Sequence, residues 1–446
     1  MDMADSLNLG CLCSTLQPRL LQAELTQRGL GHLAGQLRES HPHLFSATPV
    51  FLSQRDYRLL ERSVAALHRA SQLPGFQQHA LARASALALQ DFGPQGAFMG
   101  YDFHISPDGP RLIEINTNAG GALLHAAAAR AHRACCTPVD AMFGGPVDLD
   151  RLDEAFIEMF EAEWRSQRGD APLRTVAIVD DTPGEQYLAP EFEMARQLFA
   201  SRGIHTVVAD PRELQWRDGA LWHEDLPAGM PVDLVYNRLT DFDLSGSGHE
   251  ALHCAYAAGA AVITPHPRAH ALHADKRNLI TLSDPALLAS WGADAADLDL
   301  LRAVVPATQR VTADAAGDLW TRRRQFFFKP SGGYGSKGAY RGDKLTRRVW
   351  DEIVAGDFVA QAFVPPSERM VDVAGQATRL KLDVRAYAFA GRIQLLAART
   401  YSGQTTNFRT AGGGFSPVVI LQPAQGNAKC DCVAPKTHER PLPLHA

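Results

Sequence analysis

The chain has 446 residues, of which 46% are hydrophobic and 21% are charged. This balance is typical of a soluble globular protein with two or three domains. The net charge of −5 argues against nucleic acid as the main partner. No apolar run reaches the roughly 18 residues that a membrane helix needs, and the first residues lack the basic and apolar regions of a signal peptide. We therefore expect a cytoplasmic protein with no membrane partner.

Residues 1–85 are predicted to form an N-terminal helical segment. Leu60, Val64 and Leu67 recur at helical spacing, and the leucines between residues 20 and 33 show a similar pattern.

The next predicted unit, residues 86–150, contains a β-hairpin. A strand at 98–103 leads to the turn Asp108-Gly109, and a second strand returns at 111–116. An Asp-Gly pair between two such strands is a strong signal for a tight hairpin turn.

This hairpin carries a candidate metal site. Glu114 and Asn116 are two residues apart and so point to the same side of their strand, and Asp102 lies on the paired strand. Oxygen ligands of this kind suit Mg²⁺. A hairpin with a solvated acidic face is the alternative that the residues alone leave open.

Residues 151–275 are predicted to form a Rossmann-like, doubly wound α/β domain that holds the substrate. Its strand-like segments lie at 175–180, 205–210, 231–238 and 261–265. Helical segments alternate with these strands, which favours a parallel sheet with helices on both faces. Asn237 and Arg238 end a strand at the carboxyl edge, where α/β proteins bind ligands. We predict that they contact the substrate, with a structural salt bridge as the alternative for Arg238.

A candidate phosphate-binding loop follows in residues 331–338. The strand 325–329 delivers Lys329, and the loop after it holds four glycines together with Ser331, Ser336 and Lys337. Backbone N–H groups of such a loop can approach phosphate oxygens closely. The loop does not have the Gly-Lys-Ser/Thr order of a Walker motif. An ordinary flexible turn remains the alternative.

The last predicted hairpin carries two arginines. Strand periodicity runs through residues 382–388 and 393–397 on either side of the turn at Gly391, which places Arg385 and Arg399 on one hairpin. Guanidinium groups form fork-shaped, charge-assisted hydrogen bonds with phosphate. Surface arginines on an edge strand are the alternative. Residues 423–446 are polar and proline-bearing, and we expect an irregular tail.

Taken together, these motifs resemble the ATP-grasp superfamily, with the metal-binding hairpin moved to the front of the chain. That order resembles the circularly permuted members, eukaryotic-type glutathione synthetase and glutathionylspermidine synthetase. The resemblance covers roughly residues 86–420. It implies a mixed α/β fold, namely a permuted ATP-grasp fold whose central and lid part spans 276–422, with the Rossmann-like domain inserted before it.

The resemblance also implies roles for individual residues. The nucleotide-binding set is Lys276, Lys329, Ser331, Gly332, Gly333, Tyr334, Gly335, Ser336, Lys337, Gln361, Ala362, Phe363, Val364, Glu368 and Asn407. The two lysines would hold phosphates, residues 361–364 would meet adenine, and Glu368 would contact ribose. Asp102, Glu114 and Asn116 would bind Mg²⁺, and Arg385 and Arg399 would be catalytic. Gly100 stands where glutathionylspermidine synthetase has an arginine, so the resemblance does not identify the substrate.

The implied activity is that of an ATP-dependent ligase. Such an enzyme activates a carboxylate as an acyl phosphate and joins it to an amine, so the expected partners are small-molecule or peptide acids and amines. An ATP-dependent phosphotransferase on the same fold and a non-catalytic nucleotide-binding protein are the alternatives.

Two Cys-x-Cys pairs stand near the chain ends, namely Cys11 with Cys13 and Cys430 with Cys432. The ends of a permuted chain can be neighbours, so four thiolates could meet and hold Zn²⁺ or an iron–sulfur cluster. Free thiols near frayed ends are the alternative.

Overall fold

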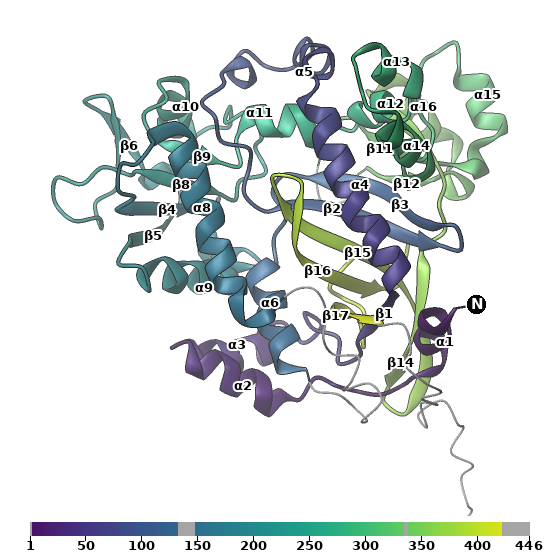
Figure 1. The fold of residues 1–446 in the computed structure, drawn as a ribbon, viewed down its shortest axis with the longest axis horizontal. Helices are drawn as coiled ribbons and strands as arrows, with labels where there is room; N and C mark the ends of the chain where they lie inside the picture. Colours follow the sequence, from purple (N-terminus) through teal and green to yellow (C-terminus); the bar gives the residue numbers. More distant parts are fainter. Residues whose placement is uncertain (1, 133–147, 334–337, 422–446) are drawn as a thin grey trace, which may run out of the picture.

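The structure is a computed structural model that describes residues 2–132, 148–333 and 338–421 (Figure 1). Its longer helices are α1 (Met3–Gly10), α2 (Pro18–Gln27), α3 (Gly31–Ser40), α4 (Gln54–Gln72), α5 (Pro74–Leu81), α6 (Ala122–Ala131), α8 (Leu152–Arg168), α9 (Ala189–Ala200), α10 (Glu250–Ala257), α14 (Ala295–Val304) and α16 (Arg347–Ala355). Shorter helical segments are α11 (Pro267–Ala269), η5 (His270–Ala274), α12 (Asn278–Leu282), α13 (Pro285–Ser290) and α15 (Ala316–Thr321). Within the described ranges, no helix combines the length and apolarity needed to cross a membrane.

One sheet is parallel and covered on both faces, as the sequence predicted. Its strands are β5 (His205–Ala209), β4 (Thr175–Val179), β8 (Leu234–Asn237) and β9 (Val262–Thr264), in that order. Val176 and Ile178 pack toward α8 and α9, whereas Ala177 and Val179 pack toward α10. Alternate residues of a strand point to opposite faces, so burial of both sets produces the doubly wound arrangement. A two-stranded ribbon, β6 (Gln215–Arg217) with β7 (Ala220–Trp222), lies beside it.

The largest sheet joins distant parts of the chain. Its order is β1 (Val50–Ser53), β17 (Gly414–Leu421), β16 (Arg392–Tyr401), β15 (Gln376–Phe389), β2 (Met99–Ser106) and β3 (Gly109–Asn116), and β14 (Ser367–Val373) also pairs with β15. The hairpin β2–β3 (blue in Figure 1) therefore lies directly beside the late hairpin β15–β16 (yellow-green). The permuted order of the motifs predicted that these early and late segments would be neighbours.

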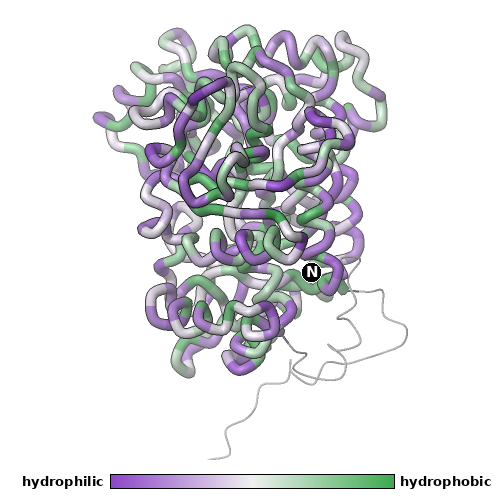
Figure 2. The backbone as a smooth tube through the Cα atoms, turned by 90° about the vertical axis from the view of Figure 1, so that its left-hand side faces the viewer, coloured by the Kyte–Doolittle hydropathy of each residue, from purple (hydrophilic) through white to green (hydrophobic). Residues whose placement is uncertain are grey.

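Strand β1 was not anticipated in the segment predicted to be helical. It pairs in parallel with β17 at the edge of the large sheet, and four residues are too few to show a clear periodicity in the sequence. Helix α4 follows it and crosses one face of the sheet (Figure 1), where Leu60, Val64 and Leu67 are buried. Hydrophobic and hydrophilic stretches alternate along the helices (Figure 2), as expected of helices that bury one face.

A third sheet is antiparallel and smaller. Its order is β10 (Thr308–Arg310), β13 (Phe358–Ala362), β11 (Phe326–Pro330) and β12 (Tyr340–Arg341). It contains the strand that ends in Lys329, and it faces the large sheet across the cavity described below.

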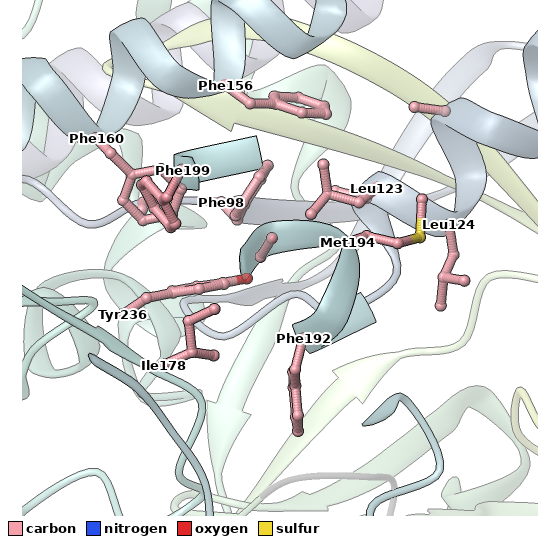
Figure 3. Packing of buried hydrophobic residues seen from close by; sticks show 14 of the residues in the cluster. Phe98, Leu123, Leu124, Phe156, Phe160, Ile178, Phe192, Met194, Phe199 and Tyr236 are labelled. Carbon is pink, nitrogen blue, oxygen red and sulfur yellow. The ribbon is translucent and has the colours of Figure 1, made fainter. Parts of the chain in front are cut away.

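Aromatic side chains form the core between the large sheet and the parallel sheet. Phe98 precedes β2 and lies among Phe156, Phe160 and Tyr236, with ring centroids 4.9–5.9 Å apart (Figure 3). Such edge-to-face contacts add to the stabilisation from buried area. This core places the carboxyl edge of the parallel sheet next to the β2–β3 hairpin.

Arg369 fixes helix α1 to the body of the protein. Its fully buried guanidinium donates hydrogen bonds to the carbonyl oxygens of Pro49 (2.7 Å), Asn8 (2.9 Å) and Cys11 (2.6 Å). The side chain of Asn8 in turn exchanges two hydrogen bonds with the backbone of Phe51. A single side chain therefore satisfies carbonyl groups at the end of α1 and in the segment before β1.

We expect Arg369→Met to lower the free energy of unfolding by about 3 kcal/mol, because several buried carbonyl groups lose their donor at once. Urea unfolding measures the change. Arg379→Met, which removes an exposed arginine paired with Glu368, is the matched control and should cost less than about 1 kcal/mol. Equal losses in the two variants would contradict the anchoring role.

Candidate functional site

The cavity that holds most of the predicted site residues lies between the large sheet and the small antiparallel sheet. Its walls come from β2 and β3, from β11, β12 and β13, and from β15, β16 and the loop after β16. Of the predicted residues, it is lined by Asp102, Glu114, Asn116, Lys276, Lys329, Gly333, Gln361, Ala362, Phe363, Val364 and Arg399. Segments more than two hundred residues apart in sequence therefore meet at a single cavity.

The hairpin turn brings the three predicted metal ligands together. Gly109 has a φ of +117°, which a glycine adopts without strain, and it allows the tight return to β3. Asp102 then lies opposite Glu114 in the strand register. The amide of Asn116 donates to the carboxylates of Asp102 (3.1 Å) and Glu114 (3.2 Å).

Two lysines face these acidic groups. Lys329, delivered by β11, is buried, and its Nζ donates to the carbonyl oxygen of Ile113 (2.6 Å) and to Oε1 of Gln361 (2.9 Å). Lys276 follows the π-helical turn η5, and its Nζ donates to the carbonyl oxygen of Gly333 (2.9 Å). The antiparallel sheet is thereby tied to the β2–β3 hairpin through Lys329.

The described part of the glycine-rich loop starts at the edge of the cavity. Ser331 is buried, and among the described residues its hydroxyl has no hydrogen-bond partner. Gly332 is open to solvent, and Gly333 has a φ of +137°, a conformation that favours glycine. The predicted contacts of Tyr334, Gly335, Ser336 and Lys337 fall outside the described residues.

A groove of backbone and ring atoms forms the far end of the cavity. Phe363 and Val364 follow β13, and the guanidinium of Arg341 lies 4.8 Å from the ring centroid of Phe363. Nδ1 of His104 lies 2.9 Å from the carbonyl oxygen of Val364. A flat aromatic ligand would fit a groove with such walls.

Arginines and aspartates alternate along the floor of the cavity. Asp102 accepts hydrogen bonds from both Arg385 and Arg399, and Arg399 also donates to Asp383 (2.7 Å). Asp383 in turn accepts from the hydroxyl of Thr406 (2.5 Å). The chain of contacts runs from β2 across β15 and β16 to the loop that closes one side of the cavity.

These charges shift the acidity of one another. Burial raises the pKa of Asp102, but the two arginines outweigh burial and hold the pKa well below its usual range. Burial likewise raises the pKa of Glu114, and Lys276 and Lys329 outweigh it, so this pKa is also lowered. Burial lowers the pKa of Lys329 to about 8, against the attraction of Glu114.

The depressed pKa of Lys329 predicts a pH dependence. The ammonium form is present below about pH 8 and is lost as the pH rises through that value. Affinity for a non-hydrolysable ATP analogue should therefore fall between pH 7 and 9, because the neutral amine attracts phosphate weakly. Fluorescence titrations across this range measure it, and Lys329→Met should show no such fall. A wild-type affinity that stays constant would contradict this role for the lysine.

Several predicted residues lie away from the cavity. Glu368 is on β14, where it pairs with Arg379 (3.1 Å). The side chain of Asn407 donates to the carbonyl oxygen of Ser402 and accepts from Thr410, so it organises its own loop. Neither residue is among those that line the cavity, and their nucleotide-binding roles stay predictions.

The predicted substrate residues occupy the carboxyl edge of the parallel sheet. Asn237 donates to the carbonyl oxygen of Pro265 (3.1 Å). Arg238 is buried over the ring of Tyr236 and donates to the side chain of Asn118, in the loop directly after Asn116. Within the described residues, its Nε has no hydrogen-bond partner. Arg238 thus borders the β2–β3 hairpin.

Comparisons with known proteins identify the fold. No protein-family model matches the sequence, and neither does any curated protein. Two solved structures match about half of the chain: the D-cycloserine synthetase DcsG is 18% identical (56% of this chain, 92% of that chain, TM-score 0.27), and the ATP-grasp ligase PsnB is 12% identical (56% and 90%, TM-score 0.28). A glutathione synthetase-like effector from Globodera pallida is 12% identical over 92% of this chain and 100% of its own, with a TM-score of 0.53.

The fold is ATP-grasp-like. The recognition of this fold from separate motifs is confirmed, and so is the mixed α/β class. The individual site residues remain predictions, because similarity at this level of identity concerns the fold alone.

Several residues that line the cavity of this ATP-grasp-like fold were missed by the sequence analysis. They are His104, Phe327, Arg341, Lys381, Tyr401 and Thr406. His104 is only two residues beyond Asp102 on the same strand, which is a signal that could have found it. Arg341 and Lys381 carry no comparable local signal.

The predicted cysteine site stays a prediction. Cys11 is buried near the end of α1 and Cys13 is partly exposed, while Cys430 and Cys432 lie outside the described residues. No group of three or more His, Cys, Asp or Glu side chains that could hold a metal occurs in residues 2–132, 148–333 and 338–421.

Proposed function

We propose that the protein is an ATP-dependent ligase that activates a carboxylate as an acyl phosphate and joins it to an amine. The observation that carries this proposal is the convergence of two lysines, Arg399 and the Glu114–Asn116 pair around a single cavity, with Arg385 bound to Asp102 beside it. Phosphate transfer needs cations that hold the phosphates and a site that neutralises the charge developing on them. The cavity supplies both.

The nucleotide would lie along the cavity. Lys276 and Lys329 would hold the phosphates, helped by backbone N–H groups of the loop from Ser331, and residues 361–364 would receive the adenine between apolar walls. Glu114 and Asn116 fit Mg²⁺, because both carry side-chain oxygens and line the cavity together with Lys276 and Lys329. When bound, the ion would neutralise charge on the β- and γ-phosphates.

The chemistry would proceed in two balanced steps. A carboxylate oxygen of the first substrate attacks the γ-phosphorus, the bond to the β-phosphate oxygen breaks, and ADP leaves. The amine then attacks the acyl carbon, inorganic phosphate leaves, and an amide forms after the amine loses a proton. Arg399 would stabilise the transferring phosphoryl group and the oxyanion, with Arg385 beside it.

The acid would enter from the side of the parallel sheet, in the unit predicted at 151–275. Arg238 stands at the carboxyl edge of that sheet beside Asn118, and a buried guanidinium suits a carboxylate partner. We propose that Asn237 and Arg238 contact the first substrate here.

The test is ADP release from Mg-ATP in the presence of pooled amino acids, peptides and polyamines, with wild type compared with Glu114→Gln. Pool-dependent ADP should form with wild type and be lost in the variant. Glu352→Gln, which changes an exposed glutamate on α16, is the matched control and should retain activity. A ligase releases one phosphate for each ADP, and the product mass shows the new amide.

The outcomes separate the alternatives. Release of ADP without free phosphate, together with a phosphorylated product, would show that the protein is a phosphotransferase instead of a ligase. Tight nucleotide binding with no turnover by any pool would favour a nucleotide-binding protein without catalysis.

A further inference from the structure

Asp102 lines the cavity, but its carboxylate is held by two arginines. Its Oδ1 accepts from Nε of Arg385 (2.6 Å), and its Oδ2 accepts from Nη2 of Arg385 (2.7 Å) and from Nη2 of Arg399 (2.8 Å). The amide of Asn116 also donates to Oδ2 (3.1 Å). The aspartate is 2% exposed, so these contacts are made away from water. Both carboxylate oxygens are thus already used by the protein.

Glu114 differs from Asp102 in its surroundings. The described residues give its carboxylate one hydrogen bond, from Asn116 (3.2 Å), and the positive charges of Lys276 and Lys329 lower its pKa. Those lysines are point charges that a nucleotide would engage, whereas Arg385 holds both oxygens of Asp102 as a bidentate fork and Arg399 donates to Oδ2. Glu114 can therefore accept further bonds, whereas both oxygens of Asp102 already accept hydrogen bonds from the protein.

Charge also argues against a cation on Asp102. A divalent ion bound there would lie beside two guanidinium groups in a buried site, where repulsion between like charges is poorly screened. It would also have to displace charge-assisted hydrogen bonds of 2.6–2.8 Å.

We propose that Asp102 is a positioning residue, which fixes Arg385 and, through a shared carboxylate, the cavity-lining Arg399, and that Glu114 and Asn116 bind the divalent cation without it. This inference rests on the proposed function. It replaces the metal-binding role that the motif implied for Asp102.

The register of the sheet supports this role. Asp102 lies directly opposite Arg385 on β15, and Asp383 lies directly opposite Arg399 on β16. Arg399 is thus held from two sides, by Asp102 and by Asp383 (2.7 Å). A guanidinium fixed in this way needs no reorganisation when charge develops on a phosphoryl group, which is the condition for effective electrostatic catalysis.

The first experiment measures cation binding rather than turnover. Mn²⁺ is titrated into the protein with a non-hydrolysable ATP analogue, and the free ion is followed by electron paramagnetic resonance. We expect Glu114→Gln to weaken Mn²⁺ binding by about 10- to 100-fold. The Mn²⁺ affinity of Asp102→Asn should stay much closer to that of wild type. If Asp102→Asn does not fold, Asp102→Asn with Arg385→Gln, which removes one buried charge of each sign, takes its place in the titration.

The second experiment is a double-mutant cycle on kcat. Asp102→Asn and Arg399→Gln should each lower kcat by about 100-fold or more, and the double variant should be little worse than either, because both remove the same oriented guanidinium. Asp102→Asn combined with Glu114→Gln should instead give roughly multiplied losses.

Three outcomes of these two experiments would overturn a proposal. Loss of Mn²⁺ affinity in Asp102→Asn equal to that in Glu114→Gln, or independent effects of Asp102→Asn and Arg399→Gln, would overturn the positioning role. A wild type that binds no Mn²⁺ with the nucleotide would overturn the proposed function together with this inference.

Discussion

Replacing Lys329 with methionine is expected to lower ATP-dependent kcat/KM by at least about 100-fold, the scale of losing one preorganised charge at a phosphoryl-transfer site. The ammonium is buried at the end of β11 and is held by the carbonyl oxygen of Ile113 and by Gln361. Methionine has a similar length and fills the space without charge, so the loss reports electrostatics rather than a cavity. ADP release and affinity for an ATP analogue measure the effect.

Lys344→Met is the matched control for this prediction. Lys344 is exposed in the helical turn that follows β12. The control should keep the activity and the nucleotide affinity of wild type. Turnover that survives in Lys329→Met would mean that another group holds the phosphates.

Replacing Arg399 with glutamine should lower kcat by about 100- to 1,000-fold while the apparent affinity for ATP changes little. The guanidinium is fixed between Asp102 and Asp383, and it lines the cavity beside the Glu114–Asn116 pair. A donor placed where charge develops acts in the transition state more than in the bound ground state. Steady-state kinetics, with the substrate pair that the pooled assay identifies, separate kcat from KM.

Arg392→Gln is the matched control for Arg399, because it changes an exposed arginine at the start of the same strand. Thermal melting of both variants checks that loss of a buried partner for Asp383 has not unfolded the protein. A folded Arg399→Gln enzyme with a normal kcat would remove this arginine from the catalytic step.

Local patterns in the sequence were enough to find the elements that build the cavity. Strand alternation and the Asp108-Gly109 turn predicted the β2–β3 hairpin, and a buried apolar run ending at Lys329 predicted the strand before the loop. These signals work because turn chemistry and the two-residue period of a strand depend only on neighbouring residues. The resemblance predicted that the early hairpin belongs beside the late one. In the structure, β2 pairs with β15.

Tertiary structure alone decided what each side chain touches. Asp102 and Glu114 look equivalent in the sequence, yet one is paired with two arginines more than 280 residues later and the other faces lysines. Glu368 and Asn407 match the motif, but their side chains bond within their own strand pair and loop. The partner of a polar group depends on strand register and on the approach of distant segments, which no local pattern encodes. The sequence by itself thus determined which strands and turns form, whereas the packing of three sheets determined which charges meet.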